Sequence, residues 1–275
     1  YLDMARQVLD LQARTHTMIL ARHNPRRQTI SIGLSPHRGA QVLAAIYQPF
    51  NQRFPQTEIK PVENYAQGFG EMLEAGKLNL AFSTAARPFS PDVFRFLPTQ
   101  QEEIVLALPA FHPLAAQASR EISQASRMPL KEFRDTPFVL MAPNTTVGQV
   151  SQQMFVQSNF LPVVVFQSSN VVMVKDMIRS GAGAGLIPAF YATPHPDVVY
   201  FRLTQPGFLA ACAVWCRQHA LTEAERYLIY LKARLWDQKA PHSLTKFLWT
   251  EDLRQIFQEF EPDYPDFPEL KGGEQ

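Results

Sequence analysis

The first residues of the chain carry apolar positions at steps of three and four. Leu2, Ala5, Leu9 and Ala13 fall on one face of a helix, and no Gly or Pro interrupts residues 1–24. The pattern therefore predicts an amphipathic helix. Its apolar stripe has no local partner, so two alternatives stay open: packing on its own domain, or pairing with a second copy of the chain.

From residue 28 onward, short apolar runs alternate with segments of helical spacing. The runs are rich in β-branched residues, which favour strands. Strands are expected over residues 29–34, 57–62, 78–82, 103–108, 138–141, 163–166, 185–188, 198–203 and 208–215. Helices are expected over residues 36–54, 67–75, 147–157, 171–179 and 222–236.

This order of elements predicts an α/β fold with two lobes. A strand, helix, strand succession requires crossover connections and a parallel sheet, and it occurs twice in tandem. Two Rossmann-like lobes joined by two crossover strands form a clamshell. Its ligand site is expected where the carboxyl ends of strands and the first turns of helices from both lobes meet.

Composition narrows the class of protein. The 275 residues are 46% hydrophobic, which excludes a disordered chain, and 26 Lys and Arg against 25 Asp and Glu argue against a domain that wraps nucleic acid by bulk charge. No run approaches the roughly 20 apolar residues of a membrane span, and no export signal is recognisable. Cys212 and Cys216, about 13 Å apart along a predicted strand, are expected to be free thiols. These features predict a cytoplasmic protein without a membrane contact.

The motifs that resemble those of enzymes are incomplete in this sequence. The Gly-Leu-Ser-Pro-His of residues 33–37 lacks the second glycine of a nucleophile elbow. The glycines of residues 181–185 follow a helix and precede a strand, which is the reverse of a dinucleotide loop, so a tight turn is expected. The histidines and cysteines show no metal-ligand spacing. We therefore predict no catalytic residue, no metal and no cofactor.

Candidate ligand-binding residues lie where predicted strands end and helices begin. There, a helix N-terminus and short hydroxyls could hold a polar or anionic ligand. For Ser35, Pro36 and His37, an ordinary helix N-cap is an equally good interpretation. The candidates are Ser35, Pro36, His37, Asn64, Ser83, Thr84, Thr99, Gln100, Asn144, Thr145, Thr146, Ser168, Ser169 and Asn170. Arg38 and Arg87 could add charge for an acidic ligand, but a solvated surface position is the favoured interpretation of each.

Five segments together resemble one known family. They are residues 1–9, residues 29–35 (Thr-Ile-Ser-Ile-Gly-Leu-Ser), residues 104–115 (with Leu-Pro-Ala-Phe-His-Pro-Leu), residues 130–139 and residues 174–188 (with Ile-Arg-Ser-Gly-Ala-Gly-Ala-Gly-Leu-Ile-Pro). In their order and spacing they resemble the effector-binding domain of LysR-type transcriptional regulators, which has the type 2 periplasmic-binding-protein fold.

The resemblance implies a bacterial regulator that binds a small-molecule effector between its lobes. It implies a linker and dimerisation helix at residues 1–27, with Leu2, Ala5, Leu9 and Ala13 in the oligomer contact. Lobe I would comprise residues 28–101 with 217–236, and lobe II residues 102–216. The family further implies a homodimer or homotetramer that binds promoter DNA through an N-terminal winged helix-turn-helix. The sequence begins at Tyr1 without such a segment, so a fragment is expected.

The C-terminal residues depart from the family pattern. Residues 237–275 extend past the usual last helix, are acidic near the end, and contain an apolar stripe over residues 253–260. A helix docked on its own or a neighbouring sensor is the preferred interpretation, and a dedicated protein contact or an acidic flap near DNA is the other. For the whole chain, the alternative function is a free-standing solute-binding protein of the same fold.

Overall fold

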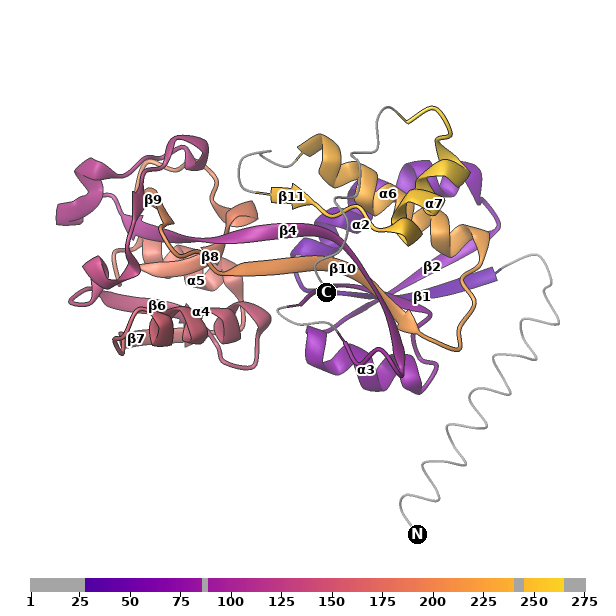
Figure 1. Cartoon of the computed structure of the whole chain (residues 1–275), viewed down its shortest axis with the longest axis horizontal. Helices are drawn as coiled ribbons and strands as arrows, with labels where there is room; N and C mark the ends of the chain where they lie inside the picture. Colours follow the sequence, from indigo (N-terminus) through magenta and orange to yellow (C-terminus); the bar gives the residue numbers. More distant parts are fainter. Residues whose placement is uncertain (1–27, 86–88, 240–244, 265–275) are drawn as a thin grey trace, which may run out of the picture.

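The computed structural model describes residues 28–85, 89–239 and 245–264. The predicted N-terminal helix, with Leu2, Ala5, Leu9 and Ala13, lies outside these residues, as does Arg87. The described part is a two-lobed α/β structure in which long strands pass from one lobe to the other (Figure 1). The expected fold class is confirmed.

Lobe I has a central sheet with helices on both faces. Its strands are β1 (Gln28–Leu34), β2 (Thr57–Glu63), β3 (Leu80–Ala85), β4 (Phe94–Pro109) and β10 (Phe208–Cys216), and its helices are α2 (Arg38–Arg53), α3 (Ala66–Glu74) and α6 (Glu223–Lys239). The strand order is β2-β1-β3-β10-β4, with β1, β2 and β3 parallel and β10 antiparallel to its neighbours. The apolar faces of α2 and α6 cover one side of the sheet, and Phe69 and Leu73 of α3 pack on the other side (Figure 1).

Lobe II repeats this arrangement on a smaller scale. It contains β5 (Arg127–Met128), β6 (Pro137–Met141), β7 (Val163–Ser168), β8 (Gly185–Pro188), β9 (Val198–Leu203), α4 (Thr146–Gln157) and α5 (Val171–Arg179), together with short 3-10 turns at Pro113–Gln117, Ile122–Gln124, Leu130–Phe133 and Ala189–Tyr191. β6 and β7 are parallel, and β6 reaches β8 through a bridge between Phe138 and Ala184. Close approach needs glycine at one point, because a Cβ on Gly148 in α4 would overlap the carbonyl oxygen of Ala142. The predicted tight turn before β8 begins at Gly181, whose φ is 88°.

β4 belongs to both lobes and is longer than the sequence indicated. Residues 94–103 pair with β10, while residues from Ile104 onward pair with β8 and β9. We expected only residues 103–108 to form a strand, because the polar run from Thr99 to Glu103 interrupts the apolar pattern. The polar side chains are tolerated inside the sheet because most find hydrogen-bond or ionic partners there.

The lobe bounds proposed from the sequence placed β10 in lobe II. In the structure, residues 210–214 of β10 pair with β3 of lobe I, and Ala213 and Trp215 contribute to the core beneath α2 and α6. Cys212 and Cys216, both in β10, are free thiols, as expected.

The C-terminal extension docks on lobe I of its own chain. β11 (Thr245–Phe247) pairs antiparallel with residues 100–102 of β4, and α7 (Glu251–Phe260) follows. Leu253, Ile256 and Phe257 of α7 are buried in the core that α2 and α6 cover. Arg226 of α6 pairs with Glu259 of α7 at 2.7 Å, and Arg234 of α6 pairs with Glu261, the residue after α7, at 2.9 Å. Of the alternatives for this helix, the structure therefore shows docking on its own lobe.

Candidate functional site

A small cavity of about 80 Å³ lies between the two lobes. Lobe I contributes the residues after β1, the start of α3 and the end of β3, and lobe II contributes the ends of β6 and β8 and the starts of α4 and α5. The lining residues are Ser35, Pro36, His37, Arg38, Tyr65, Ala66, Ser83, Thr84, Met141, Thr145, Thr146, Val147, Ser169, Val171, Pro188, Tyr191 and Leu209. Parallel strands end and helices begin at this edge of each lobe. Because both lobes repeat the same order of strands and helices, their polar turns meet here.

Many of the predicted site residues lie on this cavity wall. They are Ser35, Pro36, His37, Ser83, Thr84, Thr145, Thr146 and Ser169. The remaining predictions lie off the wall: Asn64, Thr99, Gln100, Asn144, Ser168 and Asn170. The apolar lining residues, among them Met141, Val147 and Leu209, were not predicted from the sequence. An apolar residue beside a cavity cannot be distinguished in sequence from one in a core.

Several of the off-wall residues hold the local backbone instead. Asn170 accepts hydrogen bonds from the backbone N–H groups of Val172 and Met173 and so caps α5. The Asn144 side chain accepts a hydrogen bond of 3.1 Å from the hydroxyl of Ser169, a cavity residue. Asn144 therefore contacts a residue of the wall without lining the cavity itself. Thr99 is fully buried within β4, and its hydroxyl donates to the carbonyl oxygen of Ala211.

Two of the α-helices that begin at the cavity, α4 and α2, start differently. α4 is capped by Thr145, whose hydroxyl oxygen accepts from the Gly148 N–H at 3.0 Å. α2 begins after His37, which has a φ of 61° and makes no side-chain capping hydrogen bond. A non-glycine residue in this region costs roughly 1–3 kcal/mol. The N-cap interpretation of Ser35, Pro36 and His37 thus has no support from a side-chain cap, and a strained turn faces the cavity.

Two hydrogen bonds cross the cavity from one lobe to the other. The Tyr65 hydroxyl of lobe I donates to the backbone oxygen of Ser169 at 3.1 Å. The Thr146 hydroxyl of lobe II donates to the backbone oxygen of Thr84, also at 3.1 Å. These contacts hold the lobes together in the arrangement described here.

Arg38 is buried, contrary to the solvated position favoured from the sequence. Its guanidinium pairs with the carboxylate of Glu102 in β4 and lies 4.8 Å from the centre of the Phe190 ring. Glu102 also accepts a hydrogen bond of 2.6 Å from the Phe190 backbone N–H. The expectation was wrong because the partner carboxylate is distant in sequence, and pairing is what makes burial of an arginine tolerable.

A second buried polar group lies deeper in lobe I. The Lys232 ammonium donates to the Thr99 hydroxyl at 3.0 Å and lies 5.2 Å from the centre of the Phe82 ring. Burial lowers the pKa of Lys232 to about 7. Burial likewise raises the pKa of the neighbouring Cys212 thiol to about 12. At neutral pH the Cys212 thiol is therefore protonated, and neither group lies on the cavity wall.

Tyr191 is a titratable side chain on the cavity wall itself. Burial raises the pKa of its hydroxyl to about 12, so that it stays neutral at physiological pH. Tyr191 follows β8 in lobe II and had no signal in the sequence beyond its position near a strand end. A neutral phenol can donate a hydrogen bond to a ligand as well as accept one.

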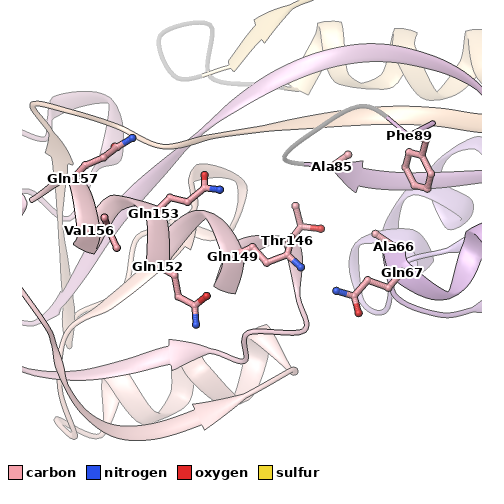
Figure 2. Close-up of a pocket in the computed structure, with 10 residues that line it drawn as sticks. All are labelled: Ala66, Gln67, Ala85, Phe89, Thr146, Gln149, Gln152, Gln153, Val156 and Gln157. Atoms are coloured by element: carbon pink, nitrogen blue, oxygen red, sulfur yellow. The ribbon is translucent and has the colours of Figure 1, made fainter. Parts of the chain in front are cut away.

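A larger groove opens outward from the cavity. It has a volume of about 850 Å³ and is bordered by α4 on one side and by the start of α3, Ala85 and Phe89 on the other (Figure 2). Ala66 and Thr146 border both spaces. Its other lining residues are Gln67, Gln149, Gln152, Gln153, Val156 and Gln157.

The described residues offer neither a metal site nor a membrane-spanning helix. Within residues 28–85, 89–239 and 245–264, no cluster of three or more His, Cys, Asp and Glu side chains could hold a metal ion. In the same residues, no helix combines the length and apolar character that crossing a membrane requires.

Sequence comparison finds one matching family and several relatives. The family model described as "LysR substrate binding domain" matches residues 23–235. The chain is 25% identical over 202 residues to the HTH-type transcriptional regulator SsuR of Burkholderia cenocepacia, covering 73% of this chain and 61% of SsuR. It is 25% identical over 175 residues to the Hca operon transcriptional activator HcaR of Escherichia coli, covering 63% of this chain and 56% of HcaR. The chain thus spans about three fifths of the length of these curated relatives.

Solved structures show the same fold. The effector-binding domain of QuiR in complex with shikimate superimposes with a TM-score of 0.63 at 15% identity, covering 78% of this chain and 99% of that one. The BenM effector-binding domain with its effector benzoate superimposes with a TM-score of 0.64 at 18% identity, covering 78% of this chain and 96% of that one. At these identities the likeness concerns the fold.

Proposed function

This chain belongs to the family of LysR substrate-binding domains, the effector-binding domains of LysR-type regulators, and from that premise we propose that it senses a small polar or anionic metabolite for a transcription regulator. The relatives SsuR and HcaR are transcriptional regulators by name. We propose that contact with promoter DNA comes from a winged helix-turn-helix in the portion of such relatives that this chain does not span. The protein would act in the cytoplasm, as a homodimer or homotetramer.

The single observation that carries the proposal is a cavity between the lobes that has hydroxyl groups on both sides. Hydroxyls of Ser35, Ser83, Thr146 and Ser169 surround it from both sides, beside the first turns of α2, α4 and α5. Such turns offer backbone N–H groups and a positive dipole end, which suit a carboxylate or a polar group. We propose that Ser35, Thr146 and Ser169 contact the ligand and that Asn144 orients the Ser169 hydroxyl.

Ligand entry requires the lobes to separate. The cavity holds about 80 Å³, whereas small-molecule sites usually have roughly 300–1,000 Å³. The hydrogen bonds from Tyr65 and Thr146 must therefore break or move when a metabolite enters. A ligand that binds the separated arrangement more tightly shifts the population toward that arrangement. The change in lobe arrangement would then be passed on to the DNA-binding domains.

We propose that the chain binds its ligand without catalysing a reaction. The relatives are regulators rather than enzymes. The groups with the most perturbed pKa values in lobe I, Lys232 and Cys212, are buried away from the cavity wall, where neither can reach a ligand.

A thermal-shift experiment tests the proposal. A ligand bound only by the folded state raises the melting temperature with concentration. The panel contains shikimate, benzoate, other small carboxylates and amino acids. One chemical class should raise the melting temperature, and Thr146→Val should reduce that rise while Thr204→Val, at an exposed threonine of lobe II, leaves it unchanged. No rise with any compound, or an equal rise in Thr146→Val, would contradict the proposed site.

A further inference from the structure

The groove outside the cavity has an unusual lining. Among the ten residues that border it, none is charged, and five are glutamines: Gln67, Gln149, Gln152, Gln153 and Gln157. We call this space the glutamine groove. Four of its glutamines lie on α4, a helix whose 12 residues include no charged side chain. Solvent-exposed helix faces ordinarily carry Lys, Glu, Arg or Asp, so the uncharged face of α4 differs from an ordinary exposed face.

The glutamine amides have their hydrogen-bonding capacity free for a ligand. Within the part of the chain that the structure describes, the five side chains form no hydrogen bond with protein groups. Each amide offers two donor hydrogens and an acceptor oxygen. Figure 2 shows the α4 glutamines along one side of the groove and Gln67 extending from the opposite lobe toward them. A molecule between the lobes therefore meets donors and acceptors from two directions.

Phe89 adds an apolar surface at the lobe I side of the groove. Its ring lies 5.8 Å from the ring of Phe94 and 6.1 Å from that of Phe96, so it is held by aromatic neighbours. An aromatic ring beside neutral amides suits a molecule that has both hydroxyl groups and a C–H face. Among the described residues that border the groove there is no counter-ion for a charged ligand, whereas the amides match the donors and acceptors of neutral hydroxyl groups.

We propose that the glutamine groove binds an uncharged polyhydroxylated molecule of the size of a short oligosaccharide. Its hydroxyls exchange hydrogen bonds with Gln149, Gln153 and Gln67, and a sugar ring lies against Phe89. At about 850 Å³ the groove is within the range of small-molecule sites, unlike the cavity of about 80 Å³. The inference deepens the proposed function and rests on it, because the groove shares Ala66 and Thr146 with the cavity.

Isothermal titration calorimetry of the 275-residue chain tests this inference. The probes are glucose, maltose, maltotriose, cellobiose, trehalose and sucrose. Affinity should rise from glucose to the di- and trisaccharides, because longer sugars reach more of the amides. It should stay constant when the salt concentration is raised, because no charge pair contributes.

Substitutions identify the groove as the place of binding. Gln149→Ala with Gln153→Ala should weaken sugar binding about tenfold or more, the effect of losing a few ligand hydrogen bonds. Gln52→Ala is the matched control, since Gln52 is an exposed glutamine of α2 outside the groove. Thermal unfolding of each variant checks that the fold is retained.

The outcomes separate this inference from the proposed function. Absence of sugar binding at millimolar concentration, or equal binding by the Gln149 and Gln153 double variant, overturns the glutamine groove. If a carboxylate still raises the melting temperature in a Thr146-dependent way, the proposed function survives that result. If neither sugars nor carboxylates bind, both are overturned.

Discussion

Arg38 and Glu102 form an ion pair of 2.5 Å at the point where the two lobes meet, and only 9% and 2% of their side chains are exposed. Glu102 also accepts the backbone N–H of Phe190, and Arg38 lies over the Phe190 ring. The pair thereby joins the start of α2, the crossover strand β4 and a turn of lobe II.

Removing the charge of Glu102 should destabilise the protein strongly. Glu102→Gln leaves the Arg38 guanidinium buried without its carboxylate, which typically costs about 3–5 kcal/mol. Urea unfolding at neutral pH measures the loss. The double variant Arg38→Met with Glu102→Gln removes both charges, so it should be less destabilised than the sum of the single variants. Simple additivity would contradict the pairing.

Lys232 should give the protein a distinct dependence of stability on pH. Its pKa is about 7 in the folded state against 10.5 for an ordinary lysine, so between these values the unfolded chain binds a proton that the folded chain does not. The free energy of unfolding should therefore rise with pH from about 7 to about 10.5. Below that window both states are protonated, and the cost of burying the charge is fully present.

The variant Lys232→Met isolates this contribution. The difference in stability between wild type and variant should change across the window, to the advantage of the wild type at higher pH. Lys131→Met, at an exposed lysine, should show no such change. A pH-independent difference for Lys232→Met would mean that Lys232 titrates normally.

Tyr65→Phe should favour separation of the lobes. The substitution deletes the hydrogen bond from the Tyr65 hydroxyl to the Ser169 backbone oxygen and leaves the ring in place. A net loss of about 1 kcal/mol changes the ratio of closed to open forms about fivefold. Small-angle scattering should report a larger radius of gyration than for Tyr47→Phe, a control at a half-exposed tyrosine of α2. Identical scattering would show that this hydrogen bond does not hold the lobes.

Docking of α7 should contribute substantially to stability. Phe257 is fully buried and contacts the rings of Tyr230, Trp249 and Tyr264. Phe257→Ala should cost about 3–5 kcal/mol, because it leaves a cavity among these rings. Phe111→Ala makes the same change at a phenylalanine that is 77% exposed, and it should cost little. Equal melting temperatures for the two variants would indicate that α7 is not docked in solution.

The two cysteines should differ in their reaction with a thiol reagent. Cys212 is fully buried, and burial raises the pKa of its thiol to about 12, so it offers neither access nor thiolate. Cys216 is half-buried at the end of β10. In native buffer one thiol should react, and Cys216→Ser should abolish that reaction. In urea the wild type should expose two reactive thiols.

Local patterns in the sequence predicted the turns of the cavity well. Ser35, Ser83, Thr146 and Ser169 each stand where an apolar run ends and a helical spacing begins or a crossover follows, and such positions are set by the order of elements. Because both lobes repeat one order, their turns converge without further information.

Features that depend on distant partners could not be predicted. The polar run that begins at Thr99 interrupts an apolar pattern, yet it lies inside β4 because β10 and β11 pair with it. Arg38 is buried only because Glu102 faces it, and 64 positions separate the two. The stripe of α7 was visible, but which surface it covers depends on the tertiary packing.

β11 attaches the C-terminal part of the chain to β4, the strand that runs through both lobes. Its ladder ends opposite Glu102, and β8 of lobe II takes up pairing with β4 at Ile104. A rotation of the lobes that bends β4 between these points leaves β11 on the lobe I side, so the C-terminal strand limits bending of β4 to positions beyond Glu102. Trp249, two residues past β11 and with its ring centre 4.5 Å from that of Phe247, lies on this lobe I side and is not among the residues that line the cavity.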